Sequence, residues 1–287
     1  MIQQQDKFAA STDAASPDRR RRMNRPRRPA FSRGPLSAFT ESFVLAGRNL
    51  RYVLRTPMTL IDTVIQPILF LVVFVFLFGG AIAGGWRAYL QLIVPGLMVQ
   101  IMMYASMGTG TALSTDISKG VFDRFRSLPI SRSAPLVGAV LGDVVRYVVA
   151  LAVLLGLAFA LGFRIGTDPL SALLACVLAI IFGITLCWLS VLVGMIVSSP
   201  QAVPGIATAV ILPLTFGSNI FADPSTMPGW LEAWTKVNPV TYFVDTVRAL
   251  MLGGEVVHPL SISLAAVLVL HLVLLPLAVR AYLHRVR

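Results

Sequence analysis

Long apolar runs recur along this chain and are separated by short polar segments. A hydrocarbon core about 30 Å thick needs roughly 20 apolar residues of α-helix to cross it. Six runs reach that length, at residues 58–80, 88–113, 136–163, 170–197, 203–222 and 260–280. The pattern therefore predicts an all-α, polytopic membrane protein with six transmembrane helices.

Composition supports a membrane protein. Hydrophobic residues make up 56% of the 287 residues and charged residues only 13%, and the mean hydropathy is +0.78. Soluble domains carry about 25% charged residues. A soluble domain is therefore excluded, and the bilayer is expected to cover most of the apolar surface.

Much of the net charge of +11 lies in an arginine-rich tail at residues 1–35. In a soluble protein this charge would suggest nucleic acid, but next to a membrane the anionic lipid headgroups explain it, so no nucleic-acid partner is expected. The tail contains several prolines and lacks apolar periodicity. We therefore expect a disordered basic tail on the cytoplasmic side.

The distribution of basic residues predicts the orientation of the spans. With the N-terminus in the cytoplasm, 19 of the 24 Lys and Arg residues fall in cytoplasmic segments, and Arg146 lies near the start of the third span. The outer segments then hold only Arg87, Arg164, Lys236 and Arg248. Cytoplasmic loops are enriched in Lys and Arg, so both termini are expected inside.

Residues 36–56 read as an amphipathic helix ahead of the first span. Apolar residues, among them Phe39 and Phe43, recur at helical spacing, and Arg48, Arg51 and Arg55 fall on the other side. Such a helix lies in the headgroup plane with its arginines toward phosphates or a partner. Both a simple topology anchor and a functional interface fit this pattern.

The loop between the second and third spans, residues 115–135, contains the most informative polar stretch. Ile117, Val121, Phe125 and Leu128 form an apolar stripe beside a charged stripe, and Pro129 follows. This spacing predicts a short helix. Aromatic anchors flanked by charges favour a knob that enters a pocket on another protein, and an ordinary interfacial turn is the alternative.

The segment 223–257 is longer than a minimal turn and is predicted to contain a helix at 239–252. Asn238 is a natural N-cap, Pro239 suits the first helical turn, and Gly253 with Gly254 ends the helix. Within this helix Asp245 and Arg248 lie one turn apart and are expected to pair. The segment also holds aromatic residues typical of a membrane interface, including Tyr242.

Two stretches give the chain a family resemblance. Residues 119–129 (KGVFDRFRSLP) and 238–250 (NPVTYFVDTVRAL) resemble the most characteristic segments of type-2 ATP-binding-cassette exporter permeases, and within them the daunorubicin-resistance permeases of actinobacteria. The likeness covers residues 36–287. It implies that 57–287 form a six-span permease domain in the bacterial cell (inner) membrane. It also implies a homodimer that works with a separate ATPase subunit, on which ATP and magnesium bind, and exports a hydrophobic or amphipathic compound, drug, antibiotic or lipid.

The resemblance also implies residue roles. The loop after the second span would be a coupling helix that docks on the ATPase, with contacts from Lys119, Phe122, Asp123, Arg124, Phe125 and Arg126. The helix at 36–56 would abut the same subunit. Re-entrant helices would shield the outer mouth of the pathway, with Asn238, Pro239, Tyr242, Asp245 and Arg248 in one of them. A simple cap on the bundle is the alternative for these helices.

A few ionisable residues lie in or near the predicted spans, and a charge at mid-membrane costs roughly 2.5–3.5 kcal/mol. They are Asp62, Asp143, Arg146 and His271. Structural pairing of Asp143 with Arg146 and a neutral His271 bonded to a neighbouring helix are favoured over a proton relay. Glycines in the second and fourth spans predict close helix packing. Met98, Met102 and Met103 are either an adaptable pathway wall or lipid-facing filler.

Other functional classes find less support in the sequence. No Gly-x-x-x-x-Gly-Lys-Ser/Thr motif is present, so the chain is not expected to hydrolyse ATP or to bind a cofactor itself. No metal-ligand spacing occurs around its histidines and cysteines. Two alternatives remain open. An ion-coupled carrier would need midplane charges and internal repeats, and a membrane-embedded transferase acting on lipid-linked substrates would need gathered polar groups, whereas the outer charges look scattered along the sequence.

Overall fold

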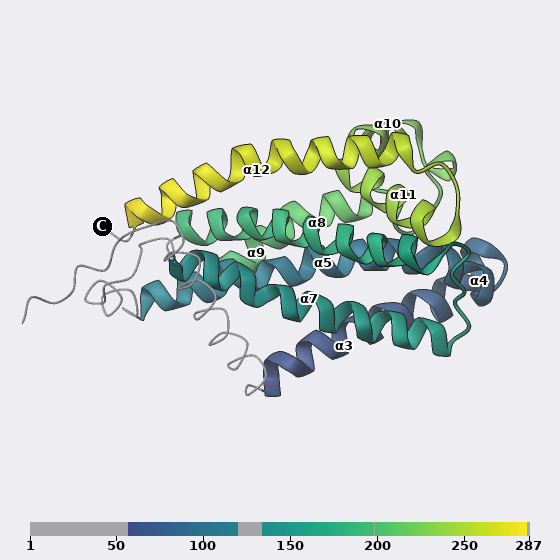
Figure 1. Cartoon of the computed structure of the whole chain (residues 1–287), viewed down its shortest axis with the longest axis horizontal. Coiled ribbons are helices and arrows are strands. Elements are labelled where there is room, and N and C mark those ends of the chain that lie inside the picture. The colour runs from purple at the N-terminus through teal and green to yellow at the C-terminus, as the bar shows by residue number, and fades with distance from the viewer. Residues whose placement is uncertain (1–56, 120–133, 198, 286–287) are drawn as a thin grey trace, which may run out of the picture. The chain divides into compact units, whose positions relative to one another are not determined.

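A computed structural model of the chain describes residues 57–119, 134–197 and 199–285. Residues 1–34 and 35–287 are separate units, and every described residue belongs to the second. Within the described ranges the regular structure is entirely helical (Figure 1). The helices are α3 (Pro57–Val73), the π-helix η1 (Phe74–Phe78), α4 (Gly79–Ala83), α5 (Trp86–Ser118), α7 (Ala134–Ala160), α8 (Pro169–Ile196), α9 (Ala202–Phe216), the 3-10 helix η2 (Pro224–Thr226), α10 (Gly229–Val237), α11 (Pro239–Leu252) and α12 (Val257–Arg285).

Five helical stretches of the described residues are long and apolar enough to cross a membrane. They correspond to five of the six predicted runs, and their bounds are Thr63–Ala83, Trp86–Ser118, Gly142–Ala160, Pro169–Ile196 and Val257–Tyr282. The all-helical, polytopic architecture is therefore confirmed. The run at 203–222 contains only the 15-residue helix α9, which at about 1.5 Å per residue is about 22 Å long.

Helix α5 forms the centre of the bundle. It packs against α3, α7, α8, α9 and α11, and it is the most deeply buried of the five spans, whereas α12 is the least. Its fully buried side chains include Ile93, Leu97 and Ile101. On the periphery, α3, α9 and α12 expose large apolar side chains such as Leu69 and Leu272. An apolar outer surface is what a lipid environment requires.

A close helix crossing joins α5 to α8 through glycines, as the sequence predicted. A Cβ atom at Gly194 would lie 2.9 Å from the carbonyl carbon of Gly110, which is closer than packed atoms approach. Ser190 of α8 strengthens the crossing, since its hydroxyl donates to the Met107 carbonyl at 2.9 Å and accepts from the Gly110 N–H at 3.1 Å. Small residues thus let the two backbones approach and bond directly.

Several of the connections between the helices lie at one end of the bundle (Figure 1). α10 and α11 lie at the same end as α4, opposite the C-terminal end of α12 (Figure 1). The α7–α8 turn is bonded to the end of α11, because Gly166 N–H donates to Met251 O at 2.9 Å and the Thr167 hydroxyl donates to Leu250 O at 2.6 Å. We call the end of the bundle that holds α4, α10 and α11 the α10–α11 end.

The structure corrects two predicted boundaries. Helix α5 continues to Ser118, whereas the sequence placed residues 115–118 in the loop. The reason is local, because the Lys119 N–H donates to the Thr115 carbonyl at 3.0 Å, so the backbone hydrogen bonding of the helix continues through this polar turn. The predicted fifth span ends early, at Phe216, where Gly217 follows and its N–H donates to Pro213 O. The rest of the predicted loop helix lies in residues 120–133, which the structure does not describe.

Candidate functional site

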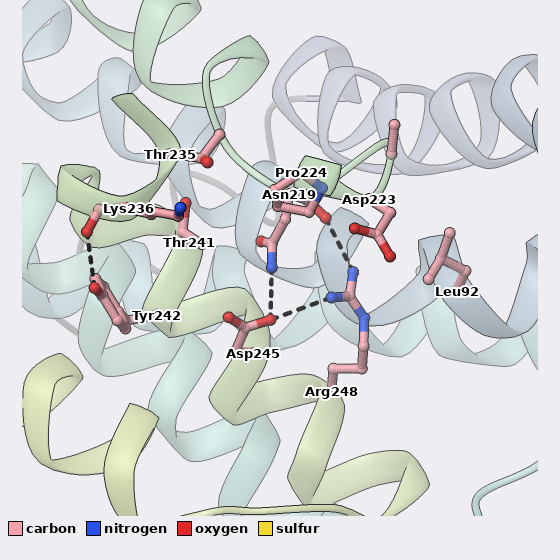
Figure 2. Close-up of a pocket in the computed structure, with 11 residues that line it drawn as sticks. Leu92, Asn219, Asp223, Pro224, Thr235, Lys236, Thr241, Tyr242, Asp245 and Arg248 are labelled. Atoms are coloured by element: carbon pink, nitrogen blue, oxygen red, sulfur yellow. Dashed lines mark hydrogen bonds and ion pairs between the residues drawn. The ribbon is translucent and has the colours of Figure 1, made fainter. Parts of the chain in front are cut away.

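A polar pocket of about 370 Å³ lies at the α10–α11 end (Figure 2). It is formed by the segment that follows α9, by η2, by the end of α10 and by one face of α11, with Leu92 of α5 at its side. The residues that line it are Leu92, Asn219, Ala222, Asp223, Pro224, Thr235, Lys236, Thr241, Tyr242, Asp245 and Arg248. Most of these side chains are polar, although the surrounding bundle is apolar.

The beginning of α11 is fixed by its N-cap, as the sequence predicted. Asn238 Oδ1 accepts from the Val240 N–H at 3.0 Å, and Pro239 occupies the first helical position. The predicted helix 239–252 matches α11 at both ends, and Gly253 and Gly254 follow with positive φ of 95° and 132°. This cap sets which face of α11 is turned toward the pocket.

Asn238 also has a role that the sequence did not reveal. Its Nδ2 donates to the carbonyls of Leu214 and Gly217, at 2.8 Å each. Carbonyls at the C-terminal end of a helix have no partner within the helix, and in an apolar surrounding they must find one. The buried Asn238 amide therefore joins the end of α9 to the beginning of α11. No local sequence signal marks such a long-range bond.

The ion pair between Asp245 and Arg248 lines the pocket. Arg248 Nη1 lies 3.3 Å from Asp245 Oδ1, which confirms the predicted pairing, and Arg248 Nη2 donates to the Asn219 carbonyl at 3.0 Å. Asn219 Nδ2 in turn donates to the same Asp245 oxygen at 2.5 Å. These bonds connect α11 to the segment after α9, as Figure 2 shows.

Burial and neighbouring charges change the pKa values in the pocket. Desolvation raises the pKa of Asp245 above its ordinary value, although Arg248 opposes the shift. Desolvation likewise lowers the pKa of Arg248. The pKa of Asp223 is lowered because the carboxylate accepts the Ser225 N–H and is also close enough to feel the Arg248 charge. Two carboxylates thus face one guanidinium.

Several buried polar atoms of the pocket have no hydrogen-bond partner among the described residues. They are Asn219 Oδ1, Thr241 Oγ1 and Arg248 Nε. Asn219 is only 5% exposed and Thr241 only 7%, and an unpartnered buried polar group costs about 1–3 kcal/mol. Such atoms make the pocket chemically suited to non-covalent binding of a polar group.

A second polar cluster lies between the spans. Arg146 Nη2 lies 3.1 Å from Asp143 Oδ1 and also donates to the Ala105 carbonyl of α5. The Cys187 thiol of α8 donates to Thr109 Oγ1 at 3.0 Å. The predicted Asp143–Arg146 pairing is confirmed, and it joins α7 to α5. The Asp62 side chain lies outside the described residues.

His271 forms the bond to a neighbouring helix that the sequence favoured. Its Nδ1 lies 3.2 Å from the Val267 carbonyl and 3.2 Å from Thr185 Oγ1 of α8. The Thr185 hydroxyl donates to Ile181 O at 2.8 Å, so both oxygens near Nδ1 are acceptors. A proton on Nδ1 satisfies this arrangement.

Comparison with known proteins decides the family. The family model described as "ABC-2 type transporter" matches residues 40–252. The chain belongs to the ABC-2 type transporter family. It is a multi-pass protein of the bacterial inner membrane and a transmembrane permease subunit of an ABC exporter. Permeases of this family work with an ATPase partner.

Individual relatives of this ABC-2 permease agree with the family match. It is 38% identical over 226 residues to the daunorubicin resistance ABC transporter permease protein DrrB1 of Streptomyces coeruleorubidus. The aligned region covers 79% of this chain and 80% of the relative. It is 28% identical to the doxorubicin resistance ABC transporter permease protein DrrB of Mycobacterium tuberculosis, over 66% of this chain and 68% of the relative. The putative transport permease ycf38 of Cyanophora paradoxa is 28% identical, over 73% of both chains.

The predicted coupling and interfacial residues of the ABC-2 permease lie largely outside the described ranges. Lys119 is described, and it is the exposed residue that follows the end of α5. The structure does not describe Phe122, Asp123, Arg124, Phe125 and Arg126 of the predicted coupling helix, nor Phe39, Phe43, Arg48, Arg51 and Arg55 of the predicted interfacial helix. Their roles stay predictions.

The predicted pathway methionines lie in the core. Met98, Met102 and Met103 have no exposed surface, so in this structure they face neither lipid nor an open cavity. Met103 Sδ accepts from the Thr215 hydroxyl of α9 at 3.8 Å. A pathway role for these residues requires the core to open and stays a prediction.

Four of the six charged residues in the segment 223–257, which looked scattered along the sequence, gather in space, whereas Glu232 and Glu255 do not line the pocket. Asp223, Lys236, Asp245 and Arg248 all line the one pocket of Figure 2. The sequence analysis was wrong on this point because η2 and α10 fold back over α11, and spacing along the chain does not show that return. It also did not single out Asn219, which lies in no recognised motif, or Thr241, which lies within the stretch 238–250.

Proposed function

We propose that this chain is the permease subunit of an exporter that moves hydrophobic or amphipathic compounds, such as a drug, an antibiotic or a lipid, out of the cytoplasm or the inner leaflet. The supporting observation is the 38% identity to a daunorubicin resistance permease over 79% of the chain. The full sequence has no phosphate-binding Gly-x-x-x-x-Gly-Lys-Ser/Thr motif, so the energy comes from a separate ATPase subunit that binds ATP and magnesium.

In the proposed topology the chain crosses the membrane six times, with both termini in the cytoplasm. The five long spans and α9 run in alternating directions, which places α10 and α11 outside. Helix α9 is shorter than the hydrocarbon core is thick. We infer that α10 and α11 enter the membrane from the outer side as re-entrant helices and cover the outer end of α9. The supporting contact is Asn238, which satisfies the last carbonyls of α9 at the point where a lipid-exposed end would be costly.

The working unit in this proposal is a homodimer with two ATPase subunits. Apolar side chains on α3, α9 and α12 are exposed in the single chain, and this surface is shared between lipid and the second copy. Closure of the ATPase pair acts on the coupling segment Lys119 and Phe122–Arg126. Because α5 ends at this segment and is packed at the centre of the bundle, a push there is transmitted to all its neighbours.

A substitution at Phe125 tests the coupling. We expect Phe125→Ala to insert in the membrane and to bind the ATPase subunit weakly, so that cargo transport and stimulation of ATP hydrolysis both fall at least tenfold. Phe159→Ala is the matched control, because this phenylalanine is 46% exposed on α7 and is not part of the coupling segment. Unchanged transport in Phe125→Ala would rule out the coupling assignment.

A further inference from the structure

The pocket at the α10–α11 end carries an unbalanced negative charge. Asp223 and Asp245 both interact with the single Arg248 guanidinium, and they also repel one another. Lys236, the other cation that lines the pocket, is paired with Glu232, since Nζ lies 2.7 Å from Oε1. With Glu232 counted, three carboxylates therefore face two cations at and beside the pocket.

The open positions in this pocket are mostly acceptors. The Asn219 amide nitrogen donates to Asp245 Oδ1, which fixes Asn219 Oδ1 as the unpartnered, acceptor end of a side chain that is 95% buried. Asp245 Oδ1 takes both the Asn219 and the Arg248 bonds, and Asp223 Oδ1 takes the Ser225 N–H. The Ser225 side chain also bonds the Asp223 carboxylate. Because a carboxylate has about four acceptor positions, both Asp223 and Asp245 keep acceptor capacity for a ligand.

An ammonium group matches these features better than an anion or a neutral alcohol does. It supplies the missing positive charge and up to three N–H donors for carboxylate and amide oxygens. Thr241 Oγ1, unpartnered and 7% exposed, can accept from or donate to a polar group beside the amine. A volume of about 370 Å³ holds one end of an amphipathic molecule rather than a whole large one.

We propose that this pocket binds the primary ammonium group of an amphipathic molecule, with Asn219, Asp223 and Asp245 as its acceptors. The amine belongs either to a lipid headgroup or to the transported compound. The second source rests on the proposed export function, whereas binding itself does not. Arg248 is a positioning residue here, because it holds Asp245 in place without contacting the ammonium.

The test uses the purified full-length chain in a non-ionic detergent and octylamine as the probe. By calorimetry at neutral pH, octylamine is expected to bind at least tenfold more tightly than 1-octanol, which has the same chain and no charge. Asp223→Asn and Asp245→Asn are each expected to weaken octylamine binding at least fivefold. Glu255→Gln is the matched control, because this exposed carboxylate does not line the pocket and is not paired with a lining residue in the described contacts, and it should bind as the wild type does.

Folding of the variants is checked by their thermal midpoints. Asp223→Asn is the decisive variant, because Asp223 is exposed and asparagine keeps the oxygen that accepts the Ser225 N–H. Equal binding of octanol and octylamine overturns the proposal. Wild-type octylamine affinity in Asp223→Asn, or an equal loss in Glu255→Gln, also overturns it.

Nanodiscs separate the two sources of the amine. If the natural ligand is a lipid headgroup, octylamine binding is weaker in phosphatidylethanolamine discs than in phosphatidylcholine discs, because the lipid amine competes. If it is the cargo, both discs give the same affinity. Either result supports an amine site. Octylamine binding without any ATP-driven transport would refute the export function and leave the amine site standing.

Discussion

Replacement of Gly110 by alanine is predicted to separate helices α5 and α8. A Cβ atom built at this position lies 2.5 Å from the carbonyl carbon of Ser190 and 2.6 Å from its Oγ. Ordinary contacts begin near 3.4 Å, so the backbones must move apart by about 1 Å. Because both neighbours are close to or part of the α8 backbone, no side-chain rotation relieves the contact.

The cost of this movement follows from what it breaks. Overpacking of a tight contact costs about 1–3 kcal/mol. The bonds of Ser190 to Gly110 N and Met107 O are also weakened, at about 0.6 kcal/mol each inside a membrane. Alanine regains about 0.5–1 kcal/mol as a better helix former than glycine. The expected net loss of stability is about 1–4 kcal/mol.

The assay is unfolding of the purified chain in mixed micelles with increasing SDS. Gly156→Ala is the matched control, because Gly156 is also inside a span, in α7, and a Cβ atom there meets nothing within 4 Å. We expect the midpoint of Gly110→Ala to fall and that of Gly156→Ala to stay or rise. Equal midpoints in the two variants would refute the close α5–α8 crossing.

Three further predictions concern polar contacts. Asp143→Ala, which leaves the Arg146 guanidinium unpaired, is expected to lower stability by about 3–5 kcal/mol, and the double variant with Arg146→Met by less; equal losses in SDS unfolding would contradict the pairing. Asn238→Ala is expected to lower the stability by about 2–4 kcal/mol. Asn238→Ser keeps the cap but cannot reach the α9 carbonyls, so it should recover about 1 kcal/mol of this loss. Full recovery would exclude a stabilising role for the bonds to α9. Hydrogen bonds from the Ser171 hydroxyl and N–H lower the pKa of Asp168, so this cap stabilises the fold above the unfolded pKa of about 3.9 and its contribution is lost as the pH falls through the folded value. Ser171→Ala should therefore reduce the drop in thermal midpoint on acidification, and an unchanged drop would contradict the assignment.

The spans and α11 were predictable because their signals are local. Apolar length located five crossing helices, and the sequence Asn238-Pro239 with Gly253-Gly254 fixed both ends of α11. The i, i+3 spacing was enough to pair Asp245 with Arg248. Each of these depends on residues within one continuous stretch of the chain, so the linear pattern contains the required information.

The polar pocket was not predictable from the same pattern. It arises where residues far apart in the chain meet, as in the bond of Asn219 to Asp245 and that of Asn238 to the end of α9. The early end of α9 has the same origin, because an apolar run does not show that another segment will satisfy its carbonyls. Coupling residues were assigned by resemblance alone.

Transport in inside-out membrane vesicles shows whether export by this chain depends on an ATPase subunit. A fluorescent anthracycline is added to the medium around vesicles that contain this chain and its ATPase subunit, and its uptake is measured with and without ATP. We expect ATP-dependent uptake that is lost when either subunit is omitted. Uptake by vesicles that hold this chain alone, at the same rate with and without ATP, would contradict it.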